Sequence, residues 1–492
     1  IGGICMLNKR RILIIATFLL LTAALVAGIY KNTSNKVKAV NSDVYEISKS
    51  IPNEAPKVRE ITINIIKTEA MINGKKISKY LYTDEKNIQY SAGYPIIANV
   101  GDTLKITVNN KTSVETNMHW HGLEVSNDQD GPDVIIKPNE NHKYEFKLNQ
   151  SGTYWYHSHN RPVRDQVDEG MYAPLIVKEK NDYKYNKDYI VMIDDWTTKN
   201  TNASSNMSNM DMSSKNSSMG NMDMNNMDMS NMGSMMEIIG DTDTINGKSY
   251  NEINPIKIST GEVDKLRFIN ASTARITTIN FPFEVLITHM DGIALQKSQK
   301  VTSIKLAPGE RIDVEVNLNN QDSKNFVITN DRNAGFSLPV IYTKINSNEK
   351  VQSYFIPNTN DPIGDVLDKP VDYDMVLSDR MGDSTHEWTI NGEIFPNVKP
   401  FDLELNKVYK IRIENKGMHV MEHPIHFHGV HFKVISINGK AVDGAIYKDT
   451  ISVKPNEYVD VAVKYTNPGM WMVHCHILDH EDGGMMMEFH VK

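Results

Sequence analysis

The chain contains almost no cysteine, since its 492 residues include only Cys5 and Cys475. A disulfide framework, which small secreted domains use in place of a large core, is therefore excluded. A basic excess is also missing, because 53 Lys and Arg stand against 61 Asp and Glu, a formal net charge of -8. We therefore expect no nucleic-acid partner. The length excludes a single hydrophobic core and predicts several domains.

Long apolar runs are scarce as well, and the one that stands out lies near the start. Lys9, Arg10 and Arg11 precede an almost unbroken apolar run over residues 12–30. This pattern is typical of an export signal, although the run is nearly long enough to span a bilayer as an anchor. We expect residues 1–34 to be a signal peptide or N-terminal anchor. The exported remainder is then extracellular, or on the cell-surface or periplasmic side of the membrane.

Alternating apolar and polar residues predict β-strands along most of the chain. The clearest runs lie at residues 104–108, 144–148, 312–318 and 459–463. One strand pattern recurs at residues 101–110, 264–270 and 407–415, and a short turn recurs at residues 137–140, 307–310 and 454–457. Recurrence of whole units indicates three related β domains.

Composition indicates where these domains begin and end. Proline and polar residues predict linkers over residues 35–57 and 346–365. The predicted domains cover residues 58–182, 183–345 and 366–492. Residues 201–236 interrupt the second domain with a low-complexity run of Asn, Ser, Asp and Met that includes eleven methionines. Such a run cannot build a core.

Ten of the sixteen histidines fall into four short clusters. The clusters are His119-Trp120-His121, His157-Ser158-His159, His423-Pro424-Ile425-His426-Phe427-His428, and His474-Cys475-His476 with His480. A His-x-His pair on a strand presents both rings to one side. A single pair is unremarkable on a protein surface. Four clusters, divided evenly between the first and third domains, instead favour a shared site for a soft metal.

The last cluster also offers a thiolate. Cys475 stands between His474 and His476, and His480 and Met485 follow. A thiolate, two imidazoles and a distant Met sulfur are the ligands of an electron-transfer copper centre, so one more imidazole must come from elsewhere. Because side chains alternate along a strand, the two flanking imidazoles point away from the thiolate. The tripeptide is therefore predicted to join two metal sites.

These motifs resemble the four copper signatures of the multicopper oxidases, the family of laccases and bacterial cuprous oxidases. The resemblance rests on His119-Trp120-His121-Gly122, His157-Ser158-His159, the 423–428 cluster, and residues 474–485, and it extends from about residue 60 to the C-terminus. It implies an all-β fold of three cupredoxin-like Greek-key β-sandwich domains. A trinuclear copper cluster would then lie between the first and third domains.

The resemblance also implies a role for each residue that matches the family's motifs. It implies four coppers: a type 1 copper on His423, Cys475, His480 and axial Met485, a type 2 copper on His119 and His426, and a type 3 pair on His121, His157, His159, His428, His474 and His476. Asp130 and Glu481 resemble the carboxylates that deliver protons in the family. The alternative for each is a solvated loop charge.

The reaction implied by this resemblance takes one electron at a time from a reductant and reduces O2 to water. Cu(I) oxidation to Cu(II), in copper detoxification, is the favoured activity, because thioether-rich exported segments suit Cu(I). The candidates for binding it are Met421 and, in the low-complexity run, Met210, Met212, Met222, Met224, Met227 and Met229. However, His419 stands where cuprous oxidases tend to have an acidic residue, and the run lies in the second domain rather than near the third.

Two other functions stay open. A broad laccase would oxidise phenols or other small organic reductants, and an extracytoplasmic copper-storage protein would use the methionines without any enzymatic activity. We expect a monomer whose only contact with the membrane, if the N-terminal segment is an anchor rather than a signal peptide, is through that segment. Five histidines lack cluster spacing and are expected at the surface or in strand packing: His142, His289, His386, His431 and His490.

Overall fold

The computed structural model describes residues 45–198, 239–318, 324–332, 336–345, 352–382 and 386–492. The expected export segment and the methionine-rich run, with its six candidate methionines, lie outside these residues. Within the described ranges, no helix has both the length and the apolar character needed to cross a membrane.

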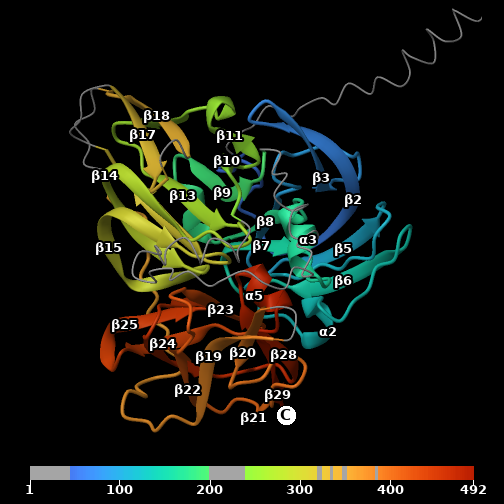
Figure 1. Ribbon diagram of the computed structural model, residues 1–492. Helices are drawn as coiled ribbons and strands as arrows, with labels where there is room; N and C mark the ends of the chain where they lie inside the picture. Colours follow the sequence, from blue (N-terminus) through green and yellow to red (C-terminus); the bar gives the residue numbers. More distant parts are fainter. Residues whose placement is uncertain (1–44, 199–238, 319–323, 333–335, 346–351, 383–385) are drawn as a thin grey trace, which may run out of the picture. The chain divides into compact units, whose positions relative to one another are not determined.

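The predicted all-β fold is confirmed, and the strands form three groups that follow one another along the chain (Figure 1). The first group has the sheets β3-β2-β5-β6 and β4-β8-β7. Its elements are β2 (Val58–Ile72), β3 (Lys75–Thr83), β4 (Ile96–Asn99), β5 (Thr103–Asn110), α2 (Asn127–Asp130), β6 (Asn141–Lys147), β7 (Gly152–His157), α3 (Val163–Asp168) and β8 (Tyr172–Lys178). A short 3-10 helix, η1 (Lys180–Lys184), follows.

The second group is one large sheet with the central order β11-β10-β9-β13-β16-β14-β17-β18-β12, to which β1 and β15 add at the side. Its elements are β9 (Asp188–Trp196), β10 (Thr242–Ile245), β11 (Lys248–Ser249), η3 (Tyr250–Glu252), β12 (Ile256–Ser259), β13 (Asp264–Asn270), β14 (Thr277–Met290), β15 (Ile293–Leu306), β16 (Arg311–Val316), β17 (Lys324–Asn330) and β18 (Ser337–Thr343). Strand β1 (Tyr45–Glu46) lies in the expected first linker and pairs with β9.

The third group has the sheets β20-β19-β22-β27-β24-β25 and β21-β29-β28-β23-β26. Its elements are β19 (Tyr373–Met381), β20 (His386–Ile390), β21 (Phe401–Leu403), β22 (Tyr409–Asn415), β23 (His423–Phe427), β24 (Phe432–Ile437), β25 (Lys440–Lys448), β26 (Thr450–Val453), β27 (Tyr458–Val463), β28 (Gly469–Cys475), α5 (Leu478–Asp482) and β29 (Met486–Val491).

The sequence repeat corresponds to one structural unit that occurs once in each group. A strand lies parallel to the repeated strand, and an antiparallel strand follows on its other side: β2-β5-β6, β9-β13-β16 and β19-β22-β27. The repeated turn bends at a residue with positive φ in each unit, namely Asn139, Gly309 and Asn456. Asn and Gly tolerate this left-handed conformation better than other residues do.

The same backbone hydrogen bond attaches each turn to the end of its repeated strand. The N–H of Asn139 donates to the carbonyl of Asn110 at 2.8 Å. The equivalent bonds join Gly309 to Asn270 at 3.0 Å and Asn456 to Asn415 at 3.1 Å. The repeat seen in the sequence is therefore a repeat of one turn and its hydrogen bonds.

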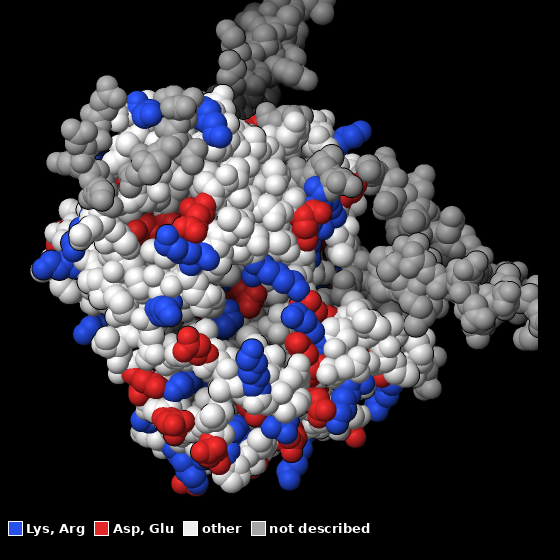
Figure 2. Space-filling model, turned by 90° about the vertical axis from the view of Figure 1, so that its left-hand side faces the viewer, with Lys and Arg blue, Asp and Glu red and all other residues white. Residues whose placement is uncertain are grey.

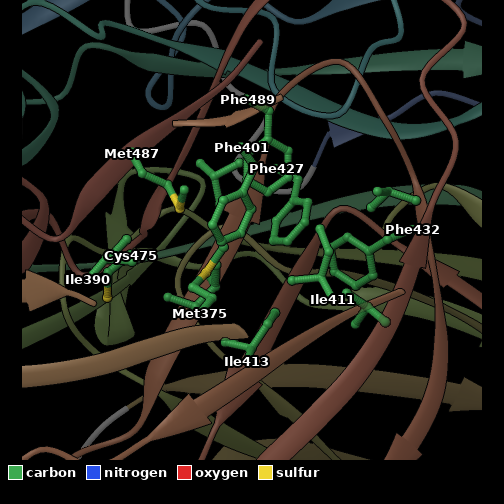
Figure 3. Packing of buried hydrophobic residues seen from close by; sticks show 14 of the residues in the cluster. Met375, Ile390, Phe401, Ile411, Ile413, Phe427, Phe432, Cys475, Met487 and Phe489 are labelled. Atoms are coloured by element: carbon green, nitrogen blue, oxygen red, sulfur yellow. The ribbon is translucent and has the colours of Figure 1, made fainter. Parts of the chain in front are cut away.

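Each strand group has its own hydrophobic core. In the third, the Phe489 ring stacks on Phe401 with centroids 5.3 Å apart and meets Phe427 edge-on at 5.4 Å (Figure 3). Burial of each such ring contributes about 1.5–3 kcal/mol. Cys475 belongs to this core, so the core holds the thiol in place.

The face drawn in Figure 2 carries acidic and basic side chains that are interspersed rather than segregated by sign. A cavity of about 560 Å³ is lined by residues of β15 and of β25, including Gln296, Lys300 and Asp443. None of the predicted copper ligands is among its described lining residues.

Candidate metal centre

All twelve residues predicted to bind copper are buried, and they come from the first and third strand groups. Their positions follow from the ends of strands. β7 ends at His157, β23 begins at His423, and β28 ends at Cys475. Strand pairing then sets histidines opposite one another, with His426 beside His474 across β23 and β28. An isolated bridge pairs His119 with His157.

Eight histidines form one continuous cluster. Their ring nitrogens fall into three groups, in each of which the potential ligand atoms lie within 4.8 Å of one another. The groups are His121, His157 and His476; His159, His428 and His474; and His119, His121 and His426. Each of the three contains imidazoles from both the first and the third strand groups.

Several of these nitrogens face one another at short distance. His428 Nε2 and His159 Nε2 lie 3.0 and 3.3 Å from His474 Nε2. Burial and then the neighbouring imidazoles lower the pKa of His157 and of His428 well below the ordinary value, which keeps both rings neutral. Neutral imidazole is the form that binds metal.

Several buried ring nitrogens of the cluster have no hydrogen-bond partner among the described residues. They are Nε2 of His119, Nε2 of His426 and both nitrogens of His476. Leaving a buried polar atom unsatisfied costs about 1–3 kcal/mol. Converging neutral donors with unsatisfied lone pairs fit metal ions, and imidazole suits copper.

A second group lies around the thiol. Cys475 Sγ is 3.5 Å from His480 Nδ1 and 3.7 Å from His423 Nδ1, and the two nitrogens are 3.1 Å apart. Met485 is fully buried beside them, and its backbone bonds to both Cys475 and His480. One thiolate and two imidazoles within 4.8 Å are a donor set suited to copper.

The two groups meet at one tripeptide. Cys475 faces His423 and His480, whereas His474 faces His159 and His428. The ring of His476 lies 5.0 Å from that of His121. The thiol is therefore separated from the histidine cluster only by the backbone of its immediate neighbours.

Two buried carboxylates touch the cluster. Asp130 Oδ2 lies 2.7 Å from His428 Nδ1, and Glu481 Oε2 lies 3.0 Å from His474 Nδ1. Although burial acts to raise it, the nearby His474 and His159 lower the pKa of Glu481 to about 2. Both residues are almost fully buried, so neither is a solvated loop charge.

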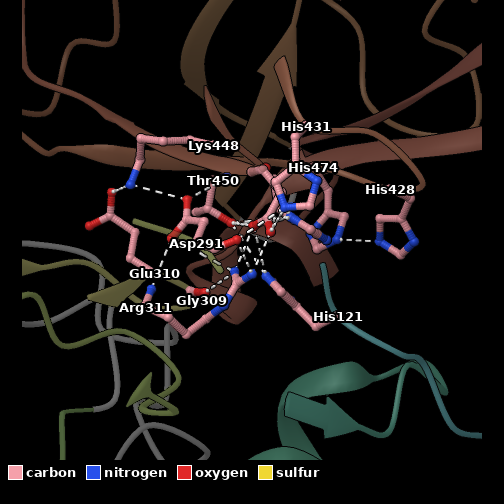
Figure 4. Close-up of polar contacts among 12 residues, drawn as sticks. His121, Asp291, Gly309, Glu310, Arg311, His428, His431, Lys448, Thr450 and His474 are labelled. Atoms are coloured by element: carbon pink, nitrogen blue, oxygen red, sulfur yellow. Dashed lines mark hydrogen bonds and ion pairs between the residues drawn. The ribbon is translucent and has the colours of Figure 1, made fainter. Parts of the chain in front are cut away.

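The sequence did not indicate a third carboxylate, Asp449. Its Oδ1 lies 3.3 Å from His121 Nε2 and 3.4 Å from His426 Nδ1. Arg311 of β16, labelled in Figure 4, donates two hydrogen bonds to Asp449, at 2.7 and 2.6 Å. Although burial acts to raise it, the Arg311 guanidinium holds the pKa of Asp449 well below its usual range. The second strand group thereby contacts a cluster to which it contributes no histidine.

His431 was expected at the surface or in strand packing, but it takes part in a buried network of charged groups. It is buried, with Nδ1 2.9 Å from Glu124 Oε1 and Nε2 3.4 Å from Asp449 Oδ2. Burial acts to lower its pKa, but the bond to Glu124 leaves the pKa above the ordinary imidazole value. Its place in this charge network depends on residues far away in sequence, so spacing alone did not indicate it.

The candidate Met421 lies just before β23, partly buried against the third core. Met418, three residues earlier, exposes 68% of its surface. Both thioethers therefore belong to the segment that leads into the His423 end of the site.

Three family models described as multicopper oxidase match residues 83–182, 187–350 and 367–492. The chain is 32% identical over 411 residues to "Multicopper oxidase mco" of Staphylococcus haemolyticus, covering 80% of each chain. It is 24% identical to a "Copper resistance protein A homolog" of Pseudomonas syringae, covering 80% of this chain and 86% of that one. The solved "Multicopper oxidase from Campylobacter jejuni: a metallo-oxidase" matches with a TM-score of 0.68 at 25% identity, covering 88% and 92%. The chain belongs to the multicopper oxidase family and is an oxidoreductase of the multicopper oxidase and laccase type.

Proposed function

We propose that the chain holds four coppers and uses them to couple oxidation of a metal ion, Cu(I), to reduction of O2. The proposed ligands are His423, Cys475, His480 and Met485 for type 1, His119 and His426 for type 2, and His121, His157, His159, His428, His474 and His476 for the type 3 pair. The observation that carries the proposal is the tripeptide 474–476, whose thiol and imidazoles face two different ligand groups. Bound copper supplies the one-electron steps and the four-electron reduction of O2 to water.

The chain itself fixes the positions of the ligand side chains and transfers protons to and from the site. Imidazoles buried by strand pairing keep their lone pairs aimed at fixed points, which favours rapid electron transfer without rearrangement. Glu481, between His474 and His159, can pass a proton at Oε1 or Oε2. Asp130 has the matching place between His428 and His119.

Cu(I) is favoured over an organic reductant by the surroundings of the proposed type 1 site. His423 and His480 are fully buried, so a bulky phenol does not touch them directly. Thioethers of Met418 and Met421 lie on the approach, and soft sulfur ligands select Cu(I). The relatives described as a metallo-oxidase and a copper resistance protein support this substrate and a role in copper detoxification.

Export is part of the same proposal. The apolar run at residues 12–30 would carry the chain out of the cytoplasm, where oxidised copper does no harm to the cell interior. We propose that it acts there as a monomer.

The test of this function is O2 uptake by the copper-loaded protein, measured with Cu(I) and with a phenol. We expect a higher kcat/KM for Cu(I). Deleting residues 207–236 should raise the KM for Cu(I), because these thioethers suit delivery of the ion. If the deletion leaves Cu(I) turnover unchanged, the run has no part in delivery. Absence of O2 uptake with any reductant would instead identify a storage protein.

Glu481→Gln is expected to slow O2 uptake by about 10²- to 10⁴-fold, the usual contribution of a positioned proton-transfer group. The amide fits the same space but cannot take up a proton and pass it on, as the ionised carboxylate does. Its effect is separated from loss of metal by measuring copper content and the visible absorption band, both of which should stay near wild type. An unchanged rate at full copper content would remove Glu481 from the proton path.

A further inference from the structure

A separate cluster of potential metal-binding groups lies beside the proposed type 1 site. It consists of Asp379 and Met381 on β19, His386 on β20, and His419 in the segment before β23. In the β19–β20 pair, Met381 lies opposite His386 and Asp379 lies opposite Trp388. The pairing thus sets a thioether against an imidazole.

Asp379 orients both rings. Its buried carboxylate has Oδ2 2.5 Å from His419 Nδ1 and 3.2 Å from His386 Nε2. Its Oδ1 accepts backbone N–H groups of Met418 and His419 at 2.7 and 3.4 Å. A negative oxygen favours the proton on the ring nitrogen that faces it. The opposite nitrogen of each ring then carries a lone pair.

One of these lone pairs faces sulfur. His386 Nδ1 lies 3.5 Å from Met381 Sδ, the same distance that separates Cys475 Sγ from His480 Nδ1. Two electron-pair donors that face each other in this way gain most from a cation between them. The His419 ring stands edge-on to His386 with centroids 4.8 Å apart, within reach of the same ion.

We infer that Met381, His386 and His419, oriented by Asp379, form the site where substrate Cu(I) binds before it is oxidised. This inference rests on the proposed function and names the residues that recognise its substrate. Thioether with neutral imidazole is a soft donor set, which favours Cu(I) over Fe(II) or Mn(II). The carboxylate is already engaged by two ring nitrogens and two backbone N–H groups, so it orients the ligands rather than binding the ion. Met381 is 69% exposed and opens the site to solvent.

Trp388 connects this site to the proposed type 1 ligands. Its ring lies 4.5 Å from His386 and stacks on His480 with centroids 3.7 Å apart. The side chain is 3% exposed, so water does not enter the contact. Each bound Cu(I) gives up one electron across Trp388 to the His480 side and leaves as Cu(II). Four such electrons, with four protons, convert one O2 into two waters.

The test compares Met381→Leu and His419→Gln with wild type in the copper-loaded full chain. Each variant should lower the ratio of kcat/KM for Cu(I) to kcat/KM for hydroquinone by roughly tenfold or more, the scale of losing a partner at a metal site. Ag(I), a soft ion that does not give up an electron under these conditions, should inhibit Cu(I) oxidation competitively in wild type and more weakly in both variants. Met71→Leu, at a methionine on β2 that is 53% exposed, is the matched control and should change neither readout.

The outcomes distinguish this inference from the function on which it rests. If wild type takes up no O2 with Cu(I), the proposed substrate itself is wrong. If wild type oxidises Cu(I) but Met381→Leu and His419→Gln behave like Met71→Leu, only the site is wrong. A loss of the type 1 absorption band in either variant would show that the residue supports His480 structurally, which also overturns the inference.

Discussion

Cys475→Ser should abolish both the intense visible absorption of the copper-loaded protein and its O2 uptake. The thiolate is the strongest soft donor in the proposed type 1 site, and a hydroxyl at the same place is a poor ligand for copper. The sulfur is also the atom at which the proposed route to His474 and His476 begins, so without it electrons lose their route to the histidine cluster. The loss should exceed the 10- to 100-fold that follows from removing an outer partner of a metal site.

The measurement pairs an absorption spectrum with an oxygen electrode on protein of known copper content. Met375→Leu is the matched control, because Met375 is fully buried in the same core (Figure 3) and Leu nearly conserves its volume. That change should cost less than about 1.5 kcal/mol and leave the colour in place. A Cys475→Ser protein that still consumed O2 at the wild-type rate would disprove the assigned route.

Arg311→Met should destabilise the protein by roughly 3–5 kcal/mol, the cost of breaking a buried ion pair from one side. Arg311 and Asp449 are both fully buried, and the two hydrogen bonds between them join the second and third strand groups (Figure 4). The unpaired Asp449 would also lose the orientation that it gives to His121 and His426. Copper retention should then weaken by about 10- to 100-fold.

Chemical unfolding at fixed copper loading, followed by tryptophan fluorescence, measures the first effect, and competition with a chelator measures the second. Arg311→Lys keeps the charge but loses the two-pronged geometry, so its loss should be smaller. Arg380→Met removes an arginine from an exposed pair with Glu387, and its effect on the free energy of unfolding should be far smaller, because solvent screens an exposed ion pair. Equal effects at Arg311 and Arg380 would contradict the role of the buried pair.

Local patterns in the sequence were sufficient to predict the all-β fold and its threefold repeat. The repeat can be recognised in the sequence because Asn139, Gly309 and Asn456 occupy the same left-handed turn position, which few residue types tolerate. The histidine clusters could be recognised for a related reason, because residues two apart on a strand point to the same side of the sheet. Both are signals carried within a few residues.

Contacts between separate strands and loops could not be predicted in this way. Arg311 and Asp449 lie 138 residues apart, and nothing in either neighbourhood distinguishes them from surface charges. His386 was expected at the surface or in strand packing. Its partners were not apparent, because Asp379 is brought beside it by the pairing of β19 with β20, and His419 by a loop. Such groups acquire their role only when the chain is folded.

The histidine cluster draws its members from positions as far apart as His119 and His476. A nascent chain therefore cannot assemble the proposed oxygen-reducing centre until its last strands have been made and docked. Metal binding of this kind contributes directly to the free energy of folding. On the proposed function, copper loading therefore depends on completed assembly, and we expect an unfinished chain not to reduce oxygen.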